Sequence, residues 1–535
     1  MSLIRRRTTI AMVAATLTAA LSACGLQDVG VQGVVTAQNA GGVAGDGTGT
    51  LPNGQPVPGA TSGPGGVPIA GGPQSGGFTG GTGGTGGTGG GGIIGGGGGG
   101  NGGGGGGGGT GPITGPTESP GLKGEINMSY VAVTGFDQLS QVVVVRSATT
   151  GDYNAQVAAV EKYINSHGGI GGKRLQTHVR TYNAMQASAA NDTALCNAIV
   201  GDDKSSFAVI HGQIHPEARD CYKNAKVMAL EGGQYGWSQE FFNQHSPYFW
   251  APSWPAYDEL LKAMVASAKR RNWFNGVAKI GIINWDETTY KRLRDNVLIP
   301  ELKKVGYTDA TIVTYDVSDA DIGSISSGLQ RASTTMIQNG VSHLMFVGTN
   351  PLQPFFVQQA GHNGNFVYAF NSIDTPRYME DNFQSQLAGS IAVGSNPITD
   401  VLDDQYPFPQ PGMEKFCVDM YKSYGVTIRA RYLDPDKNDS SDKGFDAKQA
   451  LSYCELTLLV KHVADSLPAD FSVADWSKAA EKVGTSFQMG LTFTTDLDST
   501  HTGATSFYDM AWNPNCVIPA GKGCYEYVKP LRRFE

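Results

Sequence analysis

A long glycine-rich segment divides this chain into a part that cannot build a hydrophobic core and a part that can. From about Val31 to Pro120 the sequence is mostly glycine with threonine, proline and serine, and an unbroken glycine run extends from Gly102 to Gly109. Such a segment buries too little apolar surface to offset its own ordering entropy, so we expect a disordered, flexible linker. Roughly 90 residues of glycine-rich coil have a typical reach on the order of 50 Å. The segment therefore predicts a spacer ahead of one globular body, with a neutral low-complexity insertion as the alternative.

Residues 1–23 have the pattern of an export signal. Arg5, Arg6 and Arg7 precede an apolar run from Ile10 to Leu21, and small residues then lead to Cys24. A basic segment, an apolar segment and small residues at the cut define a secretory signal, and the cysteine resembles the lipobox of bacterial lipoproteins. That resemblance implies that Cys24 carries the lipid and that residues 24–120 form an anchored linker outside the cell membrane. An ordinary signal peptide with an incidental cysteine is the alternative.

The net charge and the cysteine content limit which binding partners and which cellular compartment we expect. The formal net charge is −8, and the basic residues form no cluster beyond the signal, so we expect no nucleic-acid partner. Six cysteines follow Cys24, and an even number in an exported chain predicts disulfides. Local spacing favours the pairs Cys196–Cys221, Cys417–Cys454 and Cys516–Cys524.

Residues 121–535 alternate between strand-like and helix-like segments, and their length predicts two lobes. Short apolar runs rich in β-branched residues predict strands at Ile126–Val133, Leu175–Tyr182, Phe207–His211, Lys226–Glu231, Ala278–Asn284, Thr311–Tyr315, His343–Val347 and Phe366–Phe370. Apolar spacing with a period of 3.6 predicts helices at Ala155–Asn165, Ala187–Val200 and Tyr257–Lys269, and later at Met413–Tyr424, Phe445–Ala464 and Val473–Val483. The alternation predicts an α/β fold with parallel sheets covered on both faces by helices.

One turn makes the chain resemble a known family. The segment from Asn165 to Leu175 reads NSHGGIGGKRL and resembles a turn of type I periplasmic binding proteins of the leucine/isoleucine/valine-binding class. Gly168 and Gly169 can supply the positive φ that ends a helix. Ala278–Asn284 resembles the first strand of that family's second lobe, and Val341–Gly348 resembles the strand before its second ligand-facing loop. Members of the class also often carry a disulfide at the place of the first predicted pair.

The resemblance implies two doubly wound, Rossmann-like lobes joined by three crossovers, with a ligand trapped between them by hinge closure. Lobe 1 is expected to comprise about residues 124–255 and 391–499, and lobe 2 about residues 256–390 and 500–535. The first crossover is expected near Ser253–Ala256 and the second near Ala388–Ser395. On this reading the chain is a lipid-anchored solute-binding protein of an ABC importer, whose partners are a small solute and the permease subunits.

The candidate ligand-binding residues follow from the rule that ligands meet the carboxyl ends of strands in open α/β sheets. In lobe 1 the loops after the first, third and fourth strands offer Phe136, Gln213, Ile214, His215, Gly233, Gln234 and Tyr235. In lobe 2 the corresponding loops offer Trp285, Tyr290, Thr349, Asn350, Asn371 and Asp374. These aromatic and amide side chains suit a solute with a flat or apolar face and hydrogen-bonding groups, such as an amide, an aromatic acid or a glycoside-like compound.

The same loops depart from the family pattern for amino acids. Members that bind amino acids hold the carboxylate with serine- and threonine-rich loops and the ammonium with an acid in lobe 2. This chain has Gln213 in the first of these loops and Asn371 or Ser372 at the acidic position. Because an unpaired ammonium in a closed cleft is costly, we expect no standard branched-chain amino acid unless Asp374 or Asp286 reaches it.

We expect this protein to bind its solute without converting it. The sequence contains neither a G-x-S-x-G elbow nor an H-E-x-x-H motif, so we expect no catalytic residue and no cofactor. His211 and His215 are four residues apart, but they fall on a predicted strand end and a loop without a third ligand, so we expect no metal. The alternatives are a sensory module of the same fold that signals to a membrane partner and, further off, an extracytoplasmic enzyme.

Overall fold

The structure is a computed structural model, and it describes residues 122–135, 151–233, 235–318, 322–349, 352–359, 366–374, 376–379, 384–401, 406–428, 447–518 and 521–535. Contacts divide the chain into two units, residues 1–109 and 110–535, and every described residue belongs to the second. The predicted signal, the anchor at Cys24 and the glycine-rich linker lie outside the described residues. In the described part of the chain, no helix is both long and apolar enough to span a bilayer.

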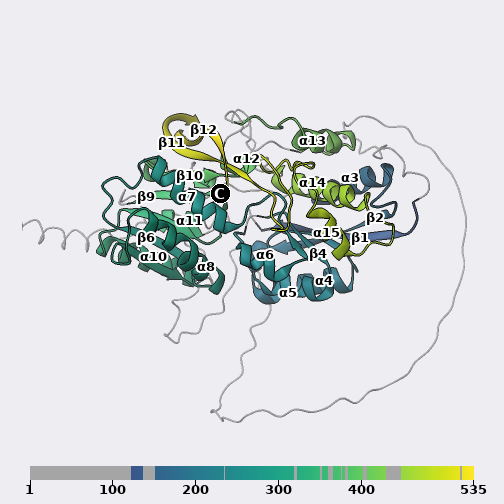
Figure 1. Cartoon of the computed structure of the whole chain (residues 1–535), viewed down its shortest axis with the longest axis horizontal. Helices are drawn as coiled ribbons and strands as arrows, with labels where there is room; N and C mark the ends of the chain where they lie inside the picture. The colour runs from purple at the N-terminus through teal and green to yellow at the C-terminus, as the bar shows by residue number, and fades with distance from the viewer. Residues whose placement is uncertain are drawn as a thin grey trace, which may run out of the picture. The chain divides into compact units, whose positions relative to one another are not determined.

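The first sheet, which defines lobe 1, has the strand order β2-β1-β3-β4-β5 and is parallel throughout. Figure 1 shows its strands β1, β2 and β4 on the right of the view. Its strands are β1 (Glu125–Thr134), β2 (Arg174–Asn183), β3 (Phe207–Ile210), β4 (Met228–Glu231) and β5 (Phe249–Trp250). Both β3 and β4 are buried along their whole length, which suits a parallel sheet with helices on both faces. One face packs against α3 (Tyr153–Ser166), α13 (Met413–Ser423), α14 (Ala447–Ala464) and α15 (Val473–Ala480), and the other against η1 (Ala184–Gln186), α4 (Ala189–Gly201), α5 (Glu217–Ala225) and α6 (Gln239–His245).

The turn between α3 and β2 shows how the local sequence sets this fold. Asp152 begins α3, where its carboxylate accepts a 3.0 Å hydrogen bond from the amide of Ala155. Gly168 and Gly169 end the helix with φ values of 90° and 67°, a region that disfavours side chains. The side chain of Asn165 then closes the turn, because it donates to the carbonyl of Leu175 at 2.9 Å and accepts from its amide at 2.7 Å.

The second sheet, which defines lobe 2, has the order β12-β11-β10-β9-β8-β6-β7. Its strands are β6 (Ile280–Trp285), β7 (Ile312–Val317), β8 (His343–Val347), β9 (Val367–Asn371), β10 (Ile391–Gly394), β11 (Ser506–Ile518) and β12 (Gly521–Arg533). The first five are parallel, whereas β11 and β12 are antiparallel. The helical segments are α7 (Tyr257–Arg270), α8 (Thr288–Leu293), the π-helical η2 (Arg294–Leu298), α9 (Ile299–Lys304), α10 (Ile322–Gln338), α11 (Leu352–Gln359), η4 (Ser372–Asp374), η5 (Pro376–Met379) and η6 (Gln384–Gln386).

The described chain passes between the two sheets after β5, after β10 and before β11. Because β10 belongs to the second sheet, the return to lobe 1 follows Gly394, where the short helix α12 (Pro397–Asp400) begins, and not residue 391. The first and third crossovers lie side by side, since the amide of Ala251 donates to the carbonyl of His501 at 2.8 Å. The structure confirms the predicted α/β architecture of two sheets with parallel cores.

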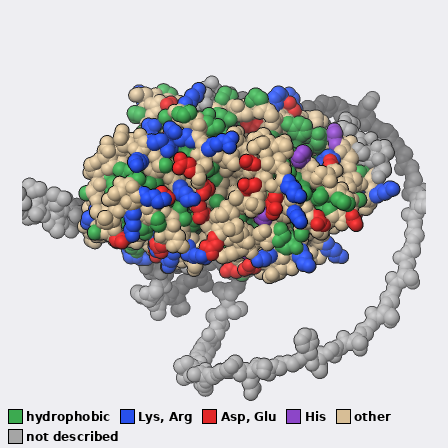
Figure 2. All heavy atoms as spheres, viewed as in Figure 1, with side chains coloured by type: hydrophobic (Ala, Val, Ile, Leu, Met, Phe, Trp, Pro, Cys, Tyr) green, Lys and Arg blue, Asp and Glu red, His purple; other side chains and the backbone are tan. Residues whose placement is uncertain are grey.

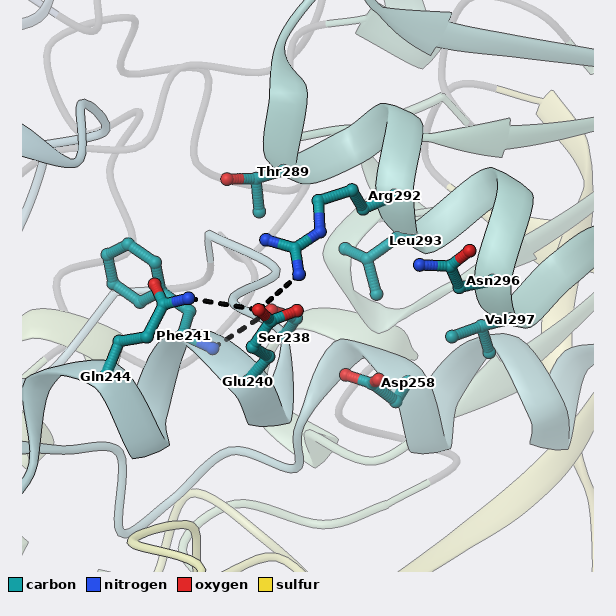
Figure 3. Close-up of a pocket in the computed structure, with 10 residues that line it drawn as sticks. All are labelled: Ser238, Glu240, Phe241, Gln244, Asp258, Thr289, Arg292, Leu293, Asn296 and Val297. Atoms are coloured by element: carbon teal, nitrogen blue, oxygen red, sulfur yellow. Dashed lines mark hydrogen bonds and ion pairs between the residues drawn. The ribbon is translucent and has the colours of Figure 1, made fainter.

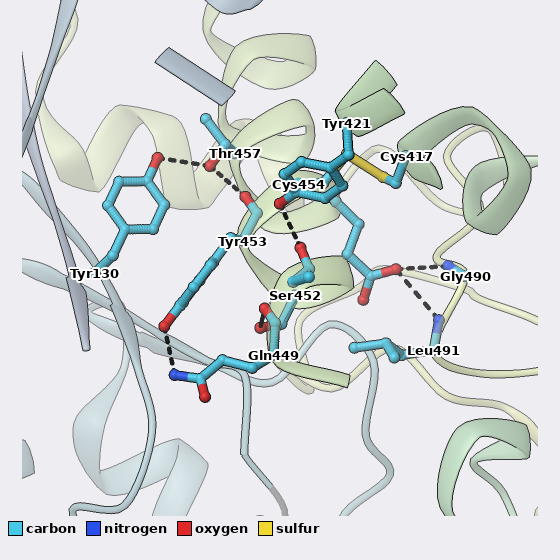
Figure 4. The surroundings of a disulfide bond; sticks show 12 residues. Tyr130, Cys417, Tyr421, Gln449, Ser452, Tyr453, Cys454, Thr457, Gly490 and Leu491 are labelled. Carbon is cyan, nitrogen blue, oxygen red and sulfur yellow. Dashed lines mark hydrogen bonds between the residues drawn. A yellow bond between two sulfur atoms is a disulfide. The ribbon is translucent and has the colours of Figure 1, made fainter. Parts of the chain in front are cut away.

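All three predicted cysteine pairs are present as disulfides. Cys196–Cys221 joins α4 to α5, and Cys516–Cys524 joins β11 to β12. Cys417–Cys454 joins α13 to α14 beside the segment that carries Gly490 and Leu491 (Figure 4). The two later disulfides therefore fix elements that the chain adds after its second crossover.

Acidic and basic side chains are interspersed on the face shown in Figure 2, with Lys and Arg lying beside Asp and Glu. Mixed charge of this kind is typical of a protein surface in water.

Candidate ligand-binding cleft

The loops at the carboxyl ends of the two sheets touch each other. Tyr290 on α8 of lobe 2 is 2% exposed, and its hydroxyl donates a 3.0 Å hydrogen bond to the carbonyl oxygen of Tyr235, in the loop after β4 of lobe 1. Nearby, Arg292 on α8 forms an ion pair with Glu240 on α6 (Figure 3). Two residues predicted for the site thus meet directly across the lobes.

A pocket opens at this seam and is lined from both lobes (Figure 3). Its lining residues are Ser238, Glu240, Phe241, Gln244, Asp258, Thr289, Arg292, Leu293, Asn296 and Val297. Asn296 and Val297 lie on the π-helical turn η2, a local geometry that often marks functional positions. We take this pocket as the outer edge of the candidate cleft, since α6 and α8 both begin at the carboxyl ends of their sheets.

The loop after β3 is anchored on α4 through Asp192. Gln213 is fully buried, and its amide donates to the Asp192 carbonyl at 2.9 Å while its oxygen accepts from the Tyr222 hydroxyl at 2.9 Å. The backbone amide and Nδ1 of His215 lie 2.9 and 3.0 Å from the Asp192 carboxylate. Ile214 between them is partly buried. The structure thus places these predicted residues together, with the polar atoms of Gln213 engaged within lobe 1.

A buried ion pair shapes the loop after β4. Glu231 accepts from Arg219 at 2.7 Å, from the Gly233 amide at 2.9 Å and from the Trp237 indole at 3.2 Å. The Arg219 guanidinium is fully buried and lies 4.9 Å from the centre of the Trp237 ring. A side chain at Gly233 would meet the ring of Tyr235 at 2.1 Å, so this position requires glycine. Arg219 and Glu231 were not among the residues predicted for the site, because only the fold brings α5 and β4 together.

In lobe 2, Trp285 and Thr349 lie next to each other at the ends of β6 and β8. The Trp285 indole donates to the Thr349 carbonyl at 3.3 Å, and both residues are nearly fully buried. The Tyr257 hydroxyl binds both the amide and the carbonyl of Gly348 at 3.1 Å, which ties the start of α7 to this loop. Trp285, which was predicted for the site, is thus buried and hydrogen-bonded at this edge of the sheet.

The acidic residue expected after β9 accepts hydrogen bonds from residues of its own lobe. Asp374 is fully buried, where it accepts from the Asn371 amide at 2.8 Å and from the Gln353 side chain. Burial raises the pKa of Asp374 well above its usual value. The other acid considered, Asp286, is about half exposed and forms an ion pair with Lys291. Both carboxylates thus have partners within lobe 2.

Three predicted residues, Phe136, Gln234 and Asn350, lie outside the described residues.

The two histidines considered as metal ligands have separate partners: His211 Nε2 lies 2.8 Å from the Ser452 hydroxyl, and His215 binds Asp192. Burial lowers the pKa of His211 to about 3, so its ring is neutral. Among the described residues, the atoms of Cys516, Cys524 and Glu526 lie close enough to share a metal ion, but the two sulfur atoms form a disulfide.

No protein-family model matches the sequence, and no curated protein matches it either. Solved structures do resemble it. A solute-binding protein of an ABC transporter from R. palustris, in complex with 4-hydroxybenzoate, has a TM-score of 0.54 at 10% identity over 77% of this chain and 98% of that chain. A possible leucine/isoleucine/valine-binding protein from Rhodopirellula baltica SH 1 has a TM-score of 0.51 at 14% identity over 76% and 97% of the two chains.

A third similar solved structure identifies the fold that this chain shares. A type 1 periplasmic binding protein from Bordetella pertussis Tohama I has a TM-score of 0.51 at 12% identity, covering 76% of this chain and 99% of that chain. At such identities the likeness shows the fold alone. The chain therefore has the fold of type I periplasmic binding proteins, as the glycine-rich turn after α3 predicted.

Proposed function

We propose that this chain is a solute-binding protein of an ABC importer that traps a small organic solute between its lobes by hinge closure. The observation that supports this most is the contact between Tyr290 and Tyr235, because it joins the two strand-end loops that such a protein closes around a solute. Crossovers at three places in the described chain suit a hinge between two otherwise rigid lobes. We propose no catalytic step for the described residues.

The candidate solute is aromatic or amide-containing, with amino-acid-like compounds as a further class. Trp285 and Tyr290 offer flat surfaces at the ends of lobe 2 strands, while Asp374 is engaged by its own backbone. An α-ammonium would therefore lack the buried acid that it requires. Two structural neighbours are described in complex with 4-hydroxybenzoate and 3,4-dihydroxybenzoic acid, which accords with an aromatic solute.

We further propose that the protein acts outside the cytoplasm and is held to the membrane by a lipid on Cys24. The glycine-rich linker then gives the binding domain reach, and the tether keeps its concentration high near the permease subunits. The support for this part is the sequence pattern of residues 1–120.

The test is a thermal-shift screen of the full-length chain against a broad solute library. A solute present at about 100 times its dissociation constant should stabilise the protein by about 2.7 kcal/mol. We expect hits from one narrow chemical class, weakened in Trp285→Ala. A chain that binds no solute, or that converts its hits into products, would contradict the proposal.

A further inference from the structure

The three crossovers between the lobes are in direct contact with one another. The carbonyl of Trp254 in the first crossover accepts from the amide of Gly503 in the third at 3.3 Å, and a side chain at Gly503 would meet the Pro252 carbonyl oxygen at 1.9 Å. The hydroxyl of Thr492, ahead of the third crossover, donates to the carbonyl of Ser395 in the second at 3.1 Å. A group that holds these segments can therefore influence the angle between the lobes.

Glu455 on α14 binds two of these segments through one carboxyl group. It accepts from the Ser253 hydroxyl at 2.5 Å in the first crossover. It also accepts from the amides of Gly490 and Leu491 at 2.6 and 3.2 Å, directly ahead of Thr492. Glu455 is fully buried and Ser253 is 1% exposed. Helix α14 of lobe 1 thus holds the first crossover and the segment that leads to the third.

These contacts suit a neutral carboxyl group as well as a carboxylate. Oε2 of Glu455 accepts from both amides, and Oε1 faces the hydroxyl of Ser253. A proton on Oε1 can be donated to the Ser253 oxygen, because a hydroxyl accepts as well as donates. The neutral acid therefore keeps all three hydrogen bonds without burying a charge, whereas the carboxylate keeps them at the cost of its hydration.

The surroundings of Glu455 favour the neutral acid up to about neutral pH. Burial is the largest influence on its pKa, which is raised to about 7. The acid Glu414 on α13 raises the pKa as well, while the hydrogen bonds from Ser253, Gly490 and Leu491 lower it. The group at the hinge therefore changes its charge within the physiological pH range.

The other titratable side chains around α14 have partners of their own. Lys448, on α14 itself, interacts electrostatically with Glu231 and Asp400. On the elements packed against α14, each of the following groups is hydrogen-bonded to another residue: Tyr130 of β1 to Thr457, Glu161 of α3 to Thr177, His211 of β3 to Ser452, Asp400 of α12 to Asn396, Tyr421 of α13 to Ala450 and Asp475 of α15 to Ser472.

We propose that Glu455 is a hinge-positioning residue that makes solute capture depend on pH. As the neutral acid it holds the crossovers in the described arrangement, in which Tyr290 meets Tyr235, and so favours closed lobes. As the carboxylate it favours an arrangement that lets water reach the charge, which loosens its hydrogen bonds to the crossovers and favours open lobes. This inference rests on the proposed function and adds a proton-dependent control to it.

A solute should therefore bind more tightly in a mildly acidic medium and be released as pH rises through neutrality. The largest possible effect is set by a pKa of about 7 in the described arrangement and the ordinary value of 4.5 in water. A group that returns from the first value to the second on opening changes the closing equilibrium by at most roughly 30-fold between about pH 5.5 and 8.

The experiment measures solute affinity on the full-length chain by isothermal titration at about pH 5.5 and 8, with intermediate points for the midpoint. The probes are benzamide, phenylacetamide and benzoate, whose charges stay constant over this range, together with those hits of the solute library that do not titrate there. The variants are Glu455→Gln, Glu414→Gln and the control Glu217→Gln, which changes an exposed acid at the start of α5. Thermal unfolding of each variant shows that it folds.

We expect the wild type to bind at least one probe or hit about 5- to 30-fold more tightly at about pH 5.5 than at about pH 8. Glu455→Gln should keep the low-pH affinity at both values, because its amide oxygen accepts from Gly490 and Leu491 while its NH₂ group donates to Ser253. Glu414→Gln should shift the midpoint of the profile to lower pH, since it removes an acid that disfavours the carboxylate. Glu217→Gln should have the wild-type profile.

Hydrogen exchange follows the hinge without a solute. The amides of Gly490 and Leu491 should lose protection in the wild type relative to Glu455→Gln at about pH 8, and the two proteins should be equally protected at about pH 5.5. A residue with a purely structural role would instead weaken binding and protection equally at both pH values when it is changed to glutamine. That result, or a pH dependence that persists in Glu455→Gln, would overturn the inference.

Two further outcomes separate this inference from the proposed function. If the wild type binds solutes with an affinity that does not change with pH, the role of Glu455 is wrong and the solute-binding function stands. If no probe and no library solute binds at either pH, the proposed function fails and the inference falls with it.

Discussion

The hydroxyl of Tyr290 in lobe 2 donates a 3.0 Å hydrogen bond to the main-chain carbonyl of Tyr235 in lobe 1. Because the acceptor is a main-chain oxygen, this hydrogen bond depends on the position of the whole loop after β4. The ion pair between Arg292 and Glu240 crosses the same seam with both side chains about half exposed. The exposed ion pair can form and break without exposing a hydrophobic core, which a hinge-closing protein requires.

Removing the Tyr290 hydroxyl should weaken closure without unfolding lobe 2. In Tyr290→Phe the ring still packs, but a net contribution of about 0.5–1.5 kcal/mol from one hydrogen bond is lost. We expect solute affinity to fall by about 2- to 10-fold, measured by titration with a hit from the thermal-shift screen. The control is Tyr307→Phe, whose hydroxyl binds Val277 within lobe 2 at 3.1 Å. Equal effects of both variants would argue against a closure role.

The pair of Arg292 and Glu240 should contribute little and should depend on salt. Exposed ion pairs are worth about 0.2–1 kcal/mol, and their coupling falls with ionic strength. We expect Glu240→Arg and Arg292→Glu each to lower solute affinity modestly and the double exchange to restore most of it at low salt. A double-mutant cycle measures the coupling, and strict additivity of the two changes would show that the pair does not help to hold the lobes together.

Most of the parallel cores could be predicted because their strands are short, apolar and β-branched. The eight expected strands correspond to β1 to β4 and β6 to β9, and the three early helices to α3, α4 and α7. The ribbon of β11 and β12 was not predicted, since Asn513, Pro514 and Asn515 indicate a turn. In the structure the ladder shifts register there and resumes at Val517. Pairing with β12, and not local propensity, extends the strand past this turn-like segment.

The candidate cleft could be predicted less well than the fold. The rule about strand ends names loops that lie at the carboxyl ends of the two sheets, but the direction of each side chain depends on residues remote in sequence. Gln213 is held by Asp192 and Tyr222, and Asp374 by Gln353 and Asn371. Ligand contact by the predicted residues stays a prediction.

Two of the disulfides should differ in their contribution to stability. Loop-closure entropy predicts about 4 kcal/mol for the Cys417–Cys454 bond, whose partners are 37 residues apart, and about 2.5 kcal/mol for Cys516–Cys524, which are 8 apart. Urea unfolding of the double alanine variants measures both values. A larger loss for the Cys516 and Cys524 pair would show that native packing, and not chain entropy, dominates.

The anchor can be tested by changing one atom. Cys24→Ser should release the protein from the membrane fraction into the soluble extracytoplasmic fraction, because a serine cannot form the thioether that carries the lipid. Cell fractionation with an antibody to the folded domain measures the distribution. The matched control is Cys196→Ser with Cys221→Ser, which removes a disulfide and keeps the lipobox. Membrane retention of Cys24→Ser would contradict the lipoprotein assignment.

A buried carboxylate links helix α14 to two crossovers. Glu455 is fully buried and accepts from the Ser253 hydroxyl at 2.5 Å in the first crossover. It also accepts from the amides of Gly490 and Leu491, at 2.6 and 3.2 Å, in the segment that leads to the third crossover. Burial is the largest influence on its pKa, which is raised to about 7, and the neighbouring acid Glu414 raises it further against these hydrogen bonds.

Stability should therefore fall as pH rises through neutrality because of this one group. The folded protein favours protonated Glu455, so its contribution is fully present below the ordinary pKa of 4.5 and is lost as pH rises through about 7. Relative to Glu455→Gln, the wild-type free energy of unfolding should drop by on the order of 3 kcal/mol across this window. Urea unfolding between about pH 4.5 and 8 measures the difference, with Glu217→Gln at the exposed start of α5 as the control. Parallel pH profiles for wild type and Glu455→Gln would mean that Glu455 stays ionised in the fold, with its three hydrogen bonds outweighing the cost of burying its charge.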